Sequence, residues 1–455
     1  GIKCKVGNEV IQSKTAVLLN RSDNNFPFPV SDFDGTHTEI QQHAAYNNYS
    51  LLQEIFVKLS PKDELSAHIW HSYYFREIQP SIQNNYDQSQ YDEISTRTTR
   101  LVFNYKHEGL LKWAANASYV DDYQLNFSDI IASRSITFAP EAEKKWKKFL
   151  LKLGGNVQYI VPQVYSYQAG VDETRADLFI LSRYSPWQTL DINLNARQGM
   201  VTDINVPFTP SAGFSWRAVQ QSGHALLLRG NVARSFKVPT LNDRYWGGLD
   251  NRYLLPEDGF NREISLDYGL NLSDYSLQLG TSAYINTVQN WIMWMPRGDI
   301  WKPQNIAKVE AKGIELSTKN TYKWDKNELQ LGCNYAYTLT TVLEGFNEMQ
   351  VFTGNQMPLL PKHSATALLK LEHDNRYLLQ LNANYIGERT TSNLFDVMDD
   401  YCLLNISTGV NFRWSKNTMN VLLQVNNVLN TVYQNMPYKA MPGTNVLFTV
   451  KYKWN

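Results

Sequence analysis

Hydrophobic and polar side chains alternate one by one through many stretches of this chain. The clearest stretch is the C-terminus, where the apolar face consists of Val446, Phe448, Val450, Tyr452 and Trp454. Threonine, lysine and asparagine dominate the intervening positions. Because successive side chains of a β-strand point to opposite faces, this pattern predicts a strand with one apolar and one polar face.

The same alternation recurs in residues 275–285, 377–385 and 406–414. In 377–385 an aromatic residue stands at each end of the apolar face, about eight residues apart. At ~3.3 Å per residue and a tilt near 40°, that separation approaches the height of a lipid-facing band. We therefore expect aromatic girdles, with Trp414, Tyr452 and Trp454 on the lipid face near the periplasmic interface.

Short and long connections alternate between the expected strands. The short ones are 60–63, 106–109, 324–327, 373–376 and 415–417. The long ones are about 23–45, 80–94, 162–173, 237–261, 343–361, 389–400 and 434–445. Antiparallel barrels of the outer membrane have short periplasmic turns and long external loops, so the alternation predicts a transmembrane antiparallel β-barrel.

The segments predict about 21 strands, of which the first, residues 1–6, is short. The order of short and long connections makes the first and last strands run in the same direction. In an antiparallel sheet this requires an odd number of strands. One further N-terminal strand brings the expected total to 22 in the complete protein. A basic amphipathic helix over 143–153 is a local alternative, but Gly154 and Gly155 follow, and the interpretation we favour is a turn leading into a strand.

Composition removes several other classes. Lys+Arg and Asp+Glu are both 43, so the basic surface that nucleic-acid binding needs is missing. Aromatic residues make up 13% of the chain, and charged residues 19%, below the usual ~25%. Three cysteines, Cys4, Cys333 and Cys402, match neither a disulfide framework nor a metal site. The scattered histidines form no catalytic constellation, and we predict no enzyme activity.

Several segments, taken in order, resemble the β-barrel of TonB-dependent outer-membrane receptors. They are residues 234–243 (RSFKVPTLND), 255–257 with Asn261 and Glu263, 305–307, 312–315, 360–363, and 425–430 with Tyr433 and 442–443. Residues 22–28 (SDNNFPF) resemble the early barrel of Bacteroidetes-type receptors for cobalamin or iron chelates. One departure is Pro442-Gly443-Thr444, where the family usually has arginine third.

The resemblance implies that residues 1–455 form a receptor barrel in the bacterial outer membrane. Such receptors carry a plug domain and a short TonB-contacting segment before the barrel, and nothing here resembles either. We therefore expect the plug and the first strand upstream of Gly1, on the same chain or on a companion chain. The polar inward faces predicted here are suited to hydrogen bonding with such a plug.

Aromatic residues in the long loops are the candidate ligand contacts. Our predicted ligand-binding residues are Tyr245, Trp246, Trp294, Arg297 and Trp301, in loops that flank one hairpin. A large planar or amphipathic ligand would use aromatic side chains as anchors and an arginine for orientation. The alternative is that these loops pack their own aromatic residues.

Acidic residues in the first long loop are a second candidate. Asp23, Asp32 and Asp34 could supply oxygen ligands to a Ca²⁺ ion, although their spacing is not that of an EF-hand. The alternative is a solvated acidic loop. No other cofactor is expected.

The resemblance implies energised uptake of a scarce large nutrient, either cobalamin or a ferric siderophore. The expected partners are the lipid bilayer, the plug, the TonB complex, a small-molecule ligand and a surface lipoprotein. The alternatives are a passive porin, a surface-docking barrel, or a receptor for haem or an oligosaccharide.

Overall fold

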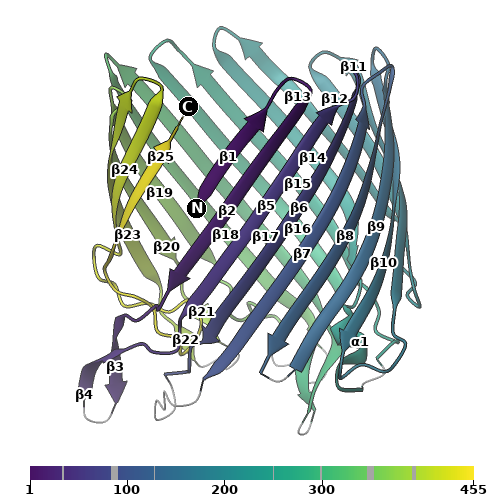
Figure 1. Cartoon of the computed structure of the whole chain (residues 1–455), viewed down its shortest axis with the longest axis horizontal. Coiled ribbons are helices and arrows are strands. Elements are labelled where there is room, and N and C mark those ends of the chain that lie inside the picture. Colours follow the sequence, from purple (N-terminus) through teal and green to yellow (C-terminus); the bar gives the residue numbers. More distant parts are fainter. Residues whose placement is uncertain are drawn as a thin grey trace.

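The computed structural model describes residues 1–32, 35–82, 91–127, 129–248, 251–297, 300–345, 353–391 and 396–454. Within these ranges the side chains of residues 31, 32, 248, 296, 297, 300 and 306 are not described. One antiparallel sheet of 21 strands curves into a barrel (Figure 1). The predicted fold class and strand number are confirmed.

The first half of the barrel consists of β1 (Ile2–Gly7), β2 (Ile11–Ser22), β5 (Tyr46–Lys58), β6 (Asp63–Ile78), β7 (Asp92–His107), β8 (Leu111–Asn126), β9 (Asp129–Lys145), β10 (Phe149–Val164), β11 (Glu173–Trp187), β12 (Leu190–Val201) and β13 (Thr209–Gln221). The second half consists of β14 (His224–Lys237), β15 (Glu257–Asn271), β16 (Tyr275–Arg297), β17 (Ile300–Trp324), β18 (Asn327–Gly345), β19 (His363–His373), β20 (Tyr377–Ile386), β23 (Tyr401–Trp414), β24 (Asn417–Asn426) and β25 (Asn445–Lys453).

Small elements lie in the long connections at one end. They are the hairpin β3 (Pro27–Asp32) and β4 (Gly35–Ile40), the pair β21 (Arg389–Thr390) and β22 (Val397–Met398), helix α1 (Leu241–Tyr245) and the 3₁₀ turn η1 (Trp246–Gly248). In Figure 1 they lie at the bottom and the short turns at the top. Among the described residues, no helix is long and apolar enough to cross a membrane.

Strand register keeps the apolar faces together. Between β20 and β23, Tyr377 pairs with Val410 and Leu381 with Ile406, so apolar residues stand opposite each other. A slip of one residue would move every side chain to the other face. The apolar outer surface therefore fixes the register.

Aromatic side chains gather at the strand ends beside the short turns. Their ring centroids lie 6.0 Å apart for Trp414 and Tyr452 and 5.3 Å apart for Tyr322 and Trp324. Trp414, Tyr452 and Trp454 are all exposed on the apolar face, as predicted. Such a girdle is what the membrane–water interface favours.

The stretch 143–153 forms no helix. β9 continues to Lys145, a three-residue turn follows, and β10 begins at Phe149. Leu151 pairs with Lys144 across this turn. Cross-strand pairing outweighs the local helical pattern, and the strand prediction is confirmed.

Three connections differ from the predicted ones. β24 ends at Asn426 and β25 begins at Asn445, so the last long connection is 427–444 and not about 434–445. β15 begins at Glu257, so residues 257–261 belong to a strand rather than to the loop. β16 and β17 extend for 23 and 25 residues and pair as far as Arg297 and Ile300. Trp294, Arg297 and Trp301 therefore lie on an extended hairpin, not in a long loop as predicted. Irregular register near Trp291 and two prolines, Pro296 and Pro303, hide this extension from period-two alternation.

The barrel wall has two edges that no described strand joins. β1 pairs only with β2 and β25 only with β24 among the described residues, and the two edges lie at the front of Figure 1. At the loop end, contacts span the gap: Gln79 Nε2 donates to Ala440 O at 2.9 Å, and Ile82 N to Tyr438 O at 3.0 Å. The 22nd strand and the upstream plug stay predictions.

Candidate ligand-capture site at the barrel mouth

The connection between β14 and β15 folds into a short helix, α1, at the loop end of the barrel, which we call the mouth. Thr240 caps α1: its hydroxyl accepts from Asp243 N at 3.1 Å, and Asp243 Oδ2 accepts from Thr240 N at 2.8 Å. This reciprocal capping box satisfies two backbone donors that a helix start otherwise leaves free. The sequence Thr-Leu-Asn-Asp therefore starts the helix at this point.

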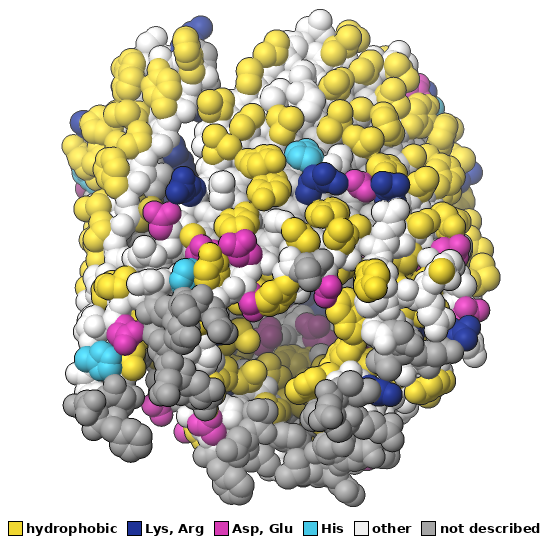
Figure 2. Space-filling model, turned by 60° about the horizontal axis from the view of Figure 1, so that its bottom comes forward, with side chains coloured by type: hydrophobic (Ala, Val, Ile, Leu, Met, Phe, Trp, Pro, Cys, Tyr) yellow, Lys and Arg dark blue, Asp and Glu magenta, His cyan; other side chains and the backbone are white. Residues whose placement is uncertain are grey.

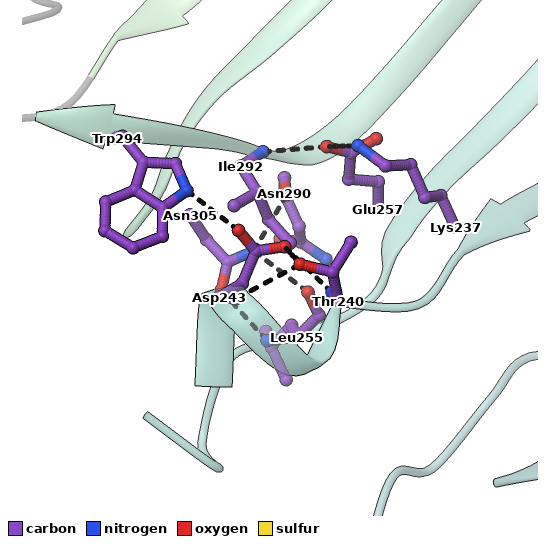
Figure 3. Close-up of polar contacts among 9 residues, drawn as sticks. All are labelled: Lys237, Thr240, Asp243, Leu255, Glu257, Asn290, Ile292, Trp294 and Asn305. Carbon is purple, nitrogen blue, oxygen red and sulfur yellow. Dashed lines mark hydrogen bonds and ion pairs between the residues drawn. The ribbon is translucent and has the colours of Figure 1, made fainter. Parts of the chain in front are cut away.

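The same aspartate joins α1 to the extended hairpin. The Trp294 indole on β16 donates to Asp243 Oδ1 at 2.9 Å (Figure 3). One carboxylate thus caps the helix with one oxygen and holds a tryptophan with the other. The aromatic side chain is fixed in orientation by this contact.

Two further polar residues, Glu257 and Asn305, fix the end of the loop on the β16–β17 hairpin (Figure 3). Glu257 Oε1 accepts from Ile292 N at 3.1 Å and from Lys237 Nζ at 3.2 Å. The Asn305 side-chain amide accepts from Leu255 N and donates to Leu255 O, both at 2.9 Å. Residues far apart in sequence therefore form one hydrogen-bonded unit at the mouth.

A buried ion pair joins α1 to the start of β11. Arg244 is 1% exposed and Glu173, at the start of β11, is 0% exposed. The Arg244 guanidinium donates to Glu173 Oε2, and Arg175 donates to Glu173 Oε1. Because a buried charge without a partner is costly, removing either residue of such a pair strongly destabilises the folded protein.

Tyr167 covers this ion pair from the connection between β10 and β11. Its hydroxyl donates to Asn242 Oδ1, and its ring centroid lies 6.1 Å from that of Tyr245. Burial raises the pKa of Tyr167 to about 12, a shift that Arg244 opposes and Asp243 reinforces. The phenol therefore keeps its proton at neutral pH and remains a hydrogen-bond donor.

The extended hairpin has a small apolar core of its own. Ala307, Val309, Val342 and Met357 are buried together, and Trp291, Met293 and Met295 pack against them. The loop-side ends of β16 to β18 therefore form a packed support rather than free loops.

Inside the barrel, beyond the mouth, the inner wall is polar. A cavity of about 850 Å³ lies against it. Its polar lining includes Asn193, Asn195, Asn231, Glu263, Asp267 and Glu315. Figure 2 shows the hollow at the mouth with acidic side chains inside it. This agrees with the predicted polar inward faces.

The predicted ligand-binding residues take different positions. Tyr245 is 8% exposed and Trp246 half-buried. Trp294 is half-buried and bonded to the helix that carries Tyr245, so these residues converge. Trp301 is 61% exposed, and the Arg297 side chain lies outside the described residues. Ligand binding by these residues stays a prediction, and Tyr245 can contact a ligand only if the loop moves.

The predicted calcium ligands are only partly described. Asp23 is exposed and lies 3.6 Å from Arg21 Nη2. The side chains of Asp32 and Asp34 lie outside the described residues. In the described part of the chain, no three His, Cys, Asp or Glu side chains are close enough to hold a metal ion. Calcium binding stays a prediction.

The residues that hold the mouth together were not predicted from sequence. Glu173, Asp243 and Arg244 look like ordinary loop charges in a linear reading. The one available signal was the Thr240–Asp243 spacing of a capping box. The partner of Arg244 is 71 residues away, and no local pattern indicates it.

Comparison with known proteins identifies the barrel. The profile of a family described as "TonB dependent receptor-like, beta-barrel" matches residues 18–428. A vitamin B12 transporter, BtuB of Photobacterium profundum, is 28% identical over 213 residues, 43% of this chain and 33% of that protein. A pesticin receptor of Yersinia enterocolitica is 23% identical over 266 residues, 56% of this chain and 35% of that protein. The chain spans about a third of the length of these relatives.

Solved structures agree on the fold. The FrpB iron transporter of Neisseria meningitidis (F5-1 variant) has a TM-score of 0.75 at 13% identity, over 98% of this chain and 78% of that chain. The ferric enterobactin receptor PfeA of Pseudomonas aeruginosa, in a double mutant, has a TM-score of 0.74 at 13% identity, over 97% and 75%. At this identity the likeness shows a common barrel and nothing finer.

Proposed function

This chain belongs to the TonB-dependent receptor β-barrel family, a multi-pass barrel of the bacterial outer membrane, and from that premise we propose that it captures and imports a scarce large nutrient. The family match over residues 18–428 is the observation that carries the proposal. We propose cobalamin or a ferric siderophore as the cargo. A relative named as a vitamin B12 transporter supports the first of these two classes.

In this proposal the mouth captures the nutrient, and the TonB complex supplies the energy for its import. A fixed tryptophan, an exposed Trp301 and a rigid hairpin supply a preorganised apolar surface, which lowers the ordering cost of binding. Release inward requires a plug that the TonB complex pulls on. The polar cavity on the inner wall suits hydrogen bonding to such a plug. The Bacteroidetes type and a surface lipoprotein partner stay predictions.

Equilibrium binding tests the cargo. The full-length protein in detergent should bind cyanocobalamin or a ferric siderophore saturably at micromolar or lower concentration. Haem and an oligosaccharide serve as the competing ligands. Saturable binding of neither proposed class, with passive flux of small solutes, would favour the porin alternative.

Surface docking is a second role that a specific relative favours. The pesticin receptors match this chain over 56% of its length, and a protein named as a receptor exposes a docking surface for what it binds. The β3–β4 hairpin projects from the barrel at the loop end (Figure 1). This role is compatible with transport.

A further inference from the structure

The two edge strands of the barrel, β25 and β1, border a gap in the wall that we call the seam. Among the described residues, β1 pairs only with β2 and β25 only with β24. In Figure 1, β1 runs up to a short turn, and the C-terminus lies toward the same end of the barrel. The outer edges of both strands therefore present backbone N–H and C=O groups to which one further strand could pair.

Lysine side chains line the seam on the inside of the barrel. Exposed apolar side chains on β1 and β25 mark the outer face, so the alternating positions face the lumen. At the short-turn end of the two strands these positions are Lys3, Lys5, Lys451 and Lys453, which we call the seam lysines. Lys5 is two residues from the end of β1, and Lys453 is the last residue of β25. The two pairs therefore lie near the same end of the barrel, one on each edge.

The strands around the seam contain no acidic residue. β23, β24, β25, β1 and β2 lack aspartate and glutamate altogether. Their other inward-facing charges, Arg413 and Lys14, are also basic. Lys5 and Lys14 stand directly opposite each other in the β1–β2 register, and a like-charge pair in this position destabilises a sheet. The inner surface at the seam therefore has an excess of positive charge.

The acidic residues close to these strands do not balance the seam lysines. Glu54 on β5 lies 3.9 Å from Lys14 Nζ and 3.0 Å from His68 Nδ1. Asp374, in the turn between β19 and β20, lies 3.4 Å from a lysine of the neighbouring turn. Glu9 is exposed in the turn between β1 and β2. No described carboxylate forms an ion pair with a seam lysine.

Elsewhere on the inner wall, several cations have carboxylate partners on the neighbouring strand. Lys152 Nζ lies 2.7 Å from Glu141 Oε2, and Arg197 Nη2 lies 2.9 Å from Asp177 Oδ2. In these pairs the charge is balanced within the wall. At the seam, the balancing carboxylates have to come from whatever fills the gap.

We propose that the seam accepts one extended segment that carries carboxylates on its inward face and apolar side chains on its outward face. Neighbouring strands lie ~4.8 Å apart, so a segment between β25 and β1 has lysines on both sides of its inward carboxylates. Its outward side chains continue the apolar surface formed by Val6 and Val450, which are exposed. The inference rests on the predicted 22nd strand and does not depend on the proposed cargo.

The seam lysines also fix the register of this segment. Two carboxylates at alternate positions match Lys3 and Lys5 on one edge and Lys451 and Lys453 on the other. A slip of one residue would turn these carboxylates toward the lipid, where a charge destabilises the barrel. Charge complementarity therefore selects the segment that fits, whether it belongs to the same chain or to a companion chain.

Zero-length cross-linking of the full-length protein tests this proposal. A water-soluble carbodiimide joins a lysine amine to a carboxylate in contact with it, with loss of water, and peptide mass spectrometry locates each amide. We expect the seam lysines to cross-link to carboxylates two residues apart in a segment outside residues 1–455. An unchanged mass on denaturing electrophoresis places that segment on the same chain, and an added mass places it on a companion chain.

Lys152 and Glu141 are the internal positive control, because their charged atoms lie 2.7 Å apart on the same inner wall. If this pair cross-links and the seam lysines do not, the proposal is overturned. Cross-links from the seam lysines only to carboxylates that lack the alternate spacing would also overturn it.

Charge reversal gives a second readout. In the full-length protein, K451E/K453E should lower the temperature at which heat-modifiable electrophoretic mobility is lost, because carboxylates would then face carboxylates. Without an acidic segment, the same change would relieve repulsion among the lysines, so an unchanged or raised temperature would contradict the proposal. Lys62→Glu, at an exposed lysine in the turn between β5 and β6, is the matched control and should leave this temperature unchanged.

Discussion

At the scale of single residues, charged side chains that water does not reach hold the mouth together. Glu173 neutralises Arg244, and Asp243 both caps α1 and binds Trp294. These contacts join β11, α1 and β16. Together with the buried Tyr245 and Leu254, they hold the connection between β14 and β15 in one conformation.

Replacing Glu173 by glutamine should release this loop. The buried Arg244 would lose its counter-charge, at a cost of about 3–5 kcal/mol. We expect faster hydrogen exchange in α1 and cleavage by protease between residues 238 and 256, with the barrel strands unchanged. Glu344→Gln, which breaks an exposed ion pair with Lys308, is the control. Equal protection in the Glu173→Gln variant and wild type would contradict a structural role for the pair.

Removing two aromatic side chains at the mouth should weaken capture. Trp246→Ala and Trp301→Ala should each raise the dissociation constant of the nutrient about tenfold, as expected for interface anchors. Trp187→Ala, an exposed tryptophan beside a short turn, should have no effect. Unchanged affinity in both mouth variants, with normal assembly, would remove these residues from the site.

Charge on the lipid face should destabilise the barrel. Val410 is on β23, four residues from the girdle residue Trp414. Val410→Arg near the midplane should cost about 2–4 kcal/mol, measured by unfolding in lipid vesicles. Gln380→Arg, on the luminal face of the neighbouring β20, should cost much less. Equal stability of the Val410→Arg variant and wild type would show that the face is wrongly assigned.

At the scale of elements, the contact of the strands with lipid made them predictable from the sequence. Within the membrane every second side chain must be apolar, so 275–285, 377–385 and 406–414 stand out in the sequence. Beyond the membrane that constraint ends. The extensions of β16 and β17 carry prolines and irregular register and were predicted as loop. The docking of α1 also depends on partners such as Glu173, far away in sequence, that local patterns do not reveal.

At the scale of the whole molecule, no strand among the described residues joins β1 to β25. Backbone groups left unpaired in lipid cost several kcal/mol each. We predict that liposomes containing only these 455 residues leak small solutes or contain poorly assembled protein. If the predicted strand and plug are supplied, on the same chain or as a companion chain, the barrel should seal them. A tight barrel formed by these 455 residues alone would contradict the predicted 22nd strand.

Energised uptake is the central claim, and transport into cells tests it most directly. In the organism that encodes this protein, deletion of its gene should abolish high-affinity uptake of radiolabelled cobalamin or of a ferric siderophore. Restoring the gene should restore uptake, and a protonophore or loss of TonB should stop it again. Uptake of both nutrient classes at the wild-type rate in the deletion strain, or uptake through the restored protein that continues without TonB, would contradict the account.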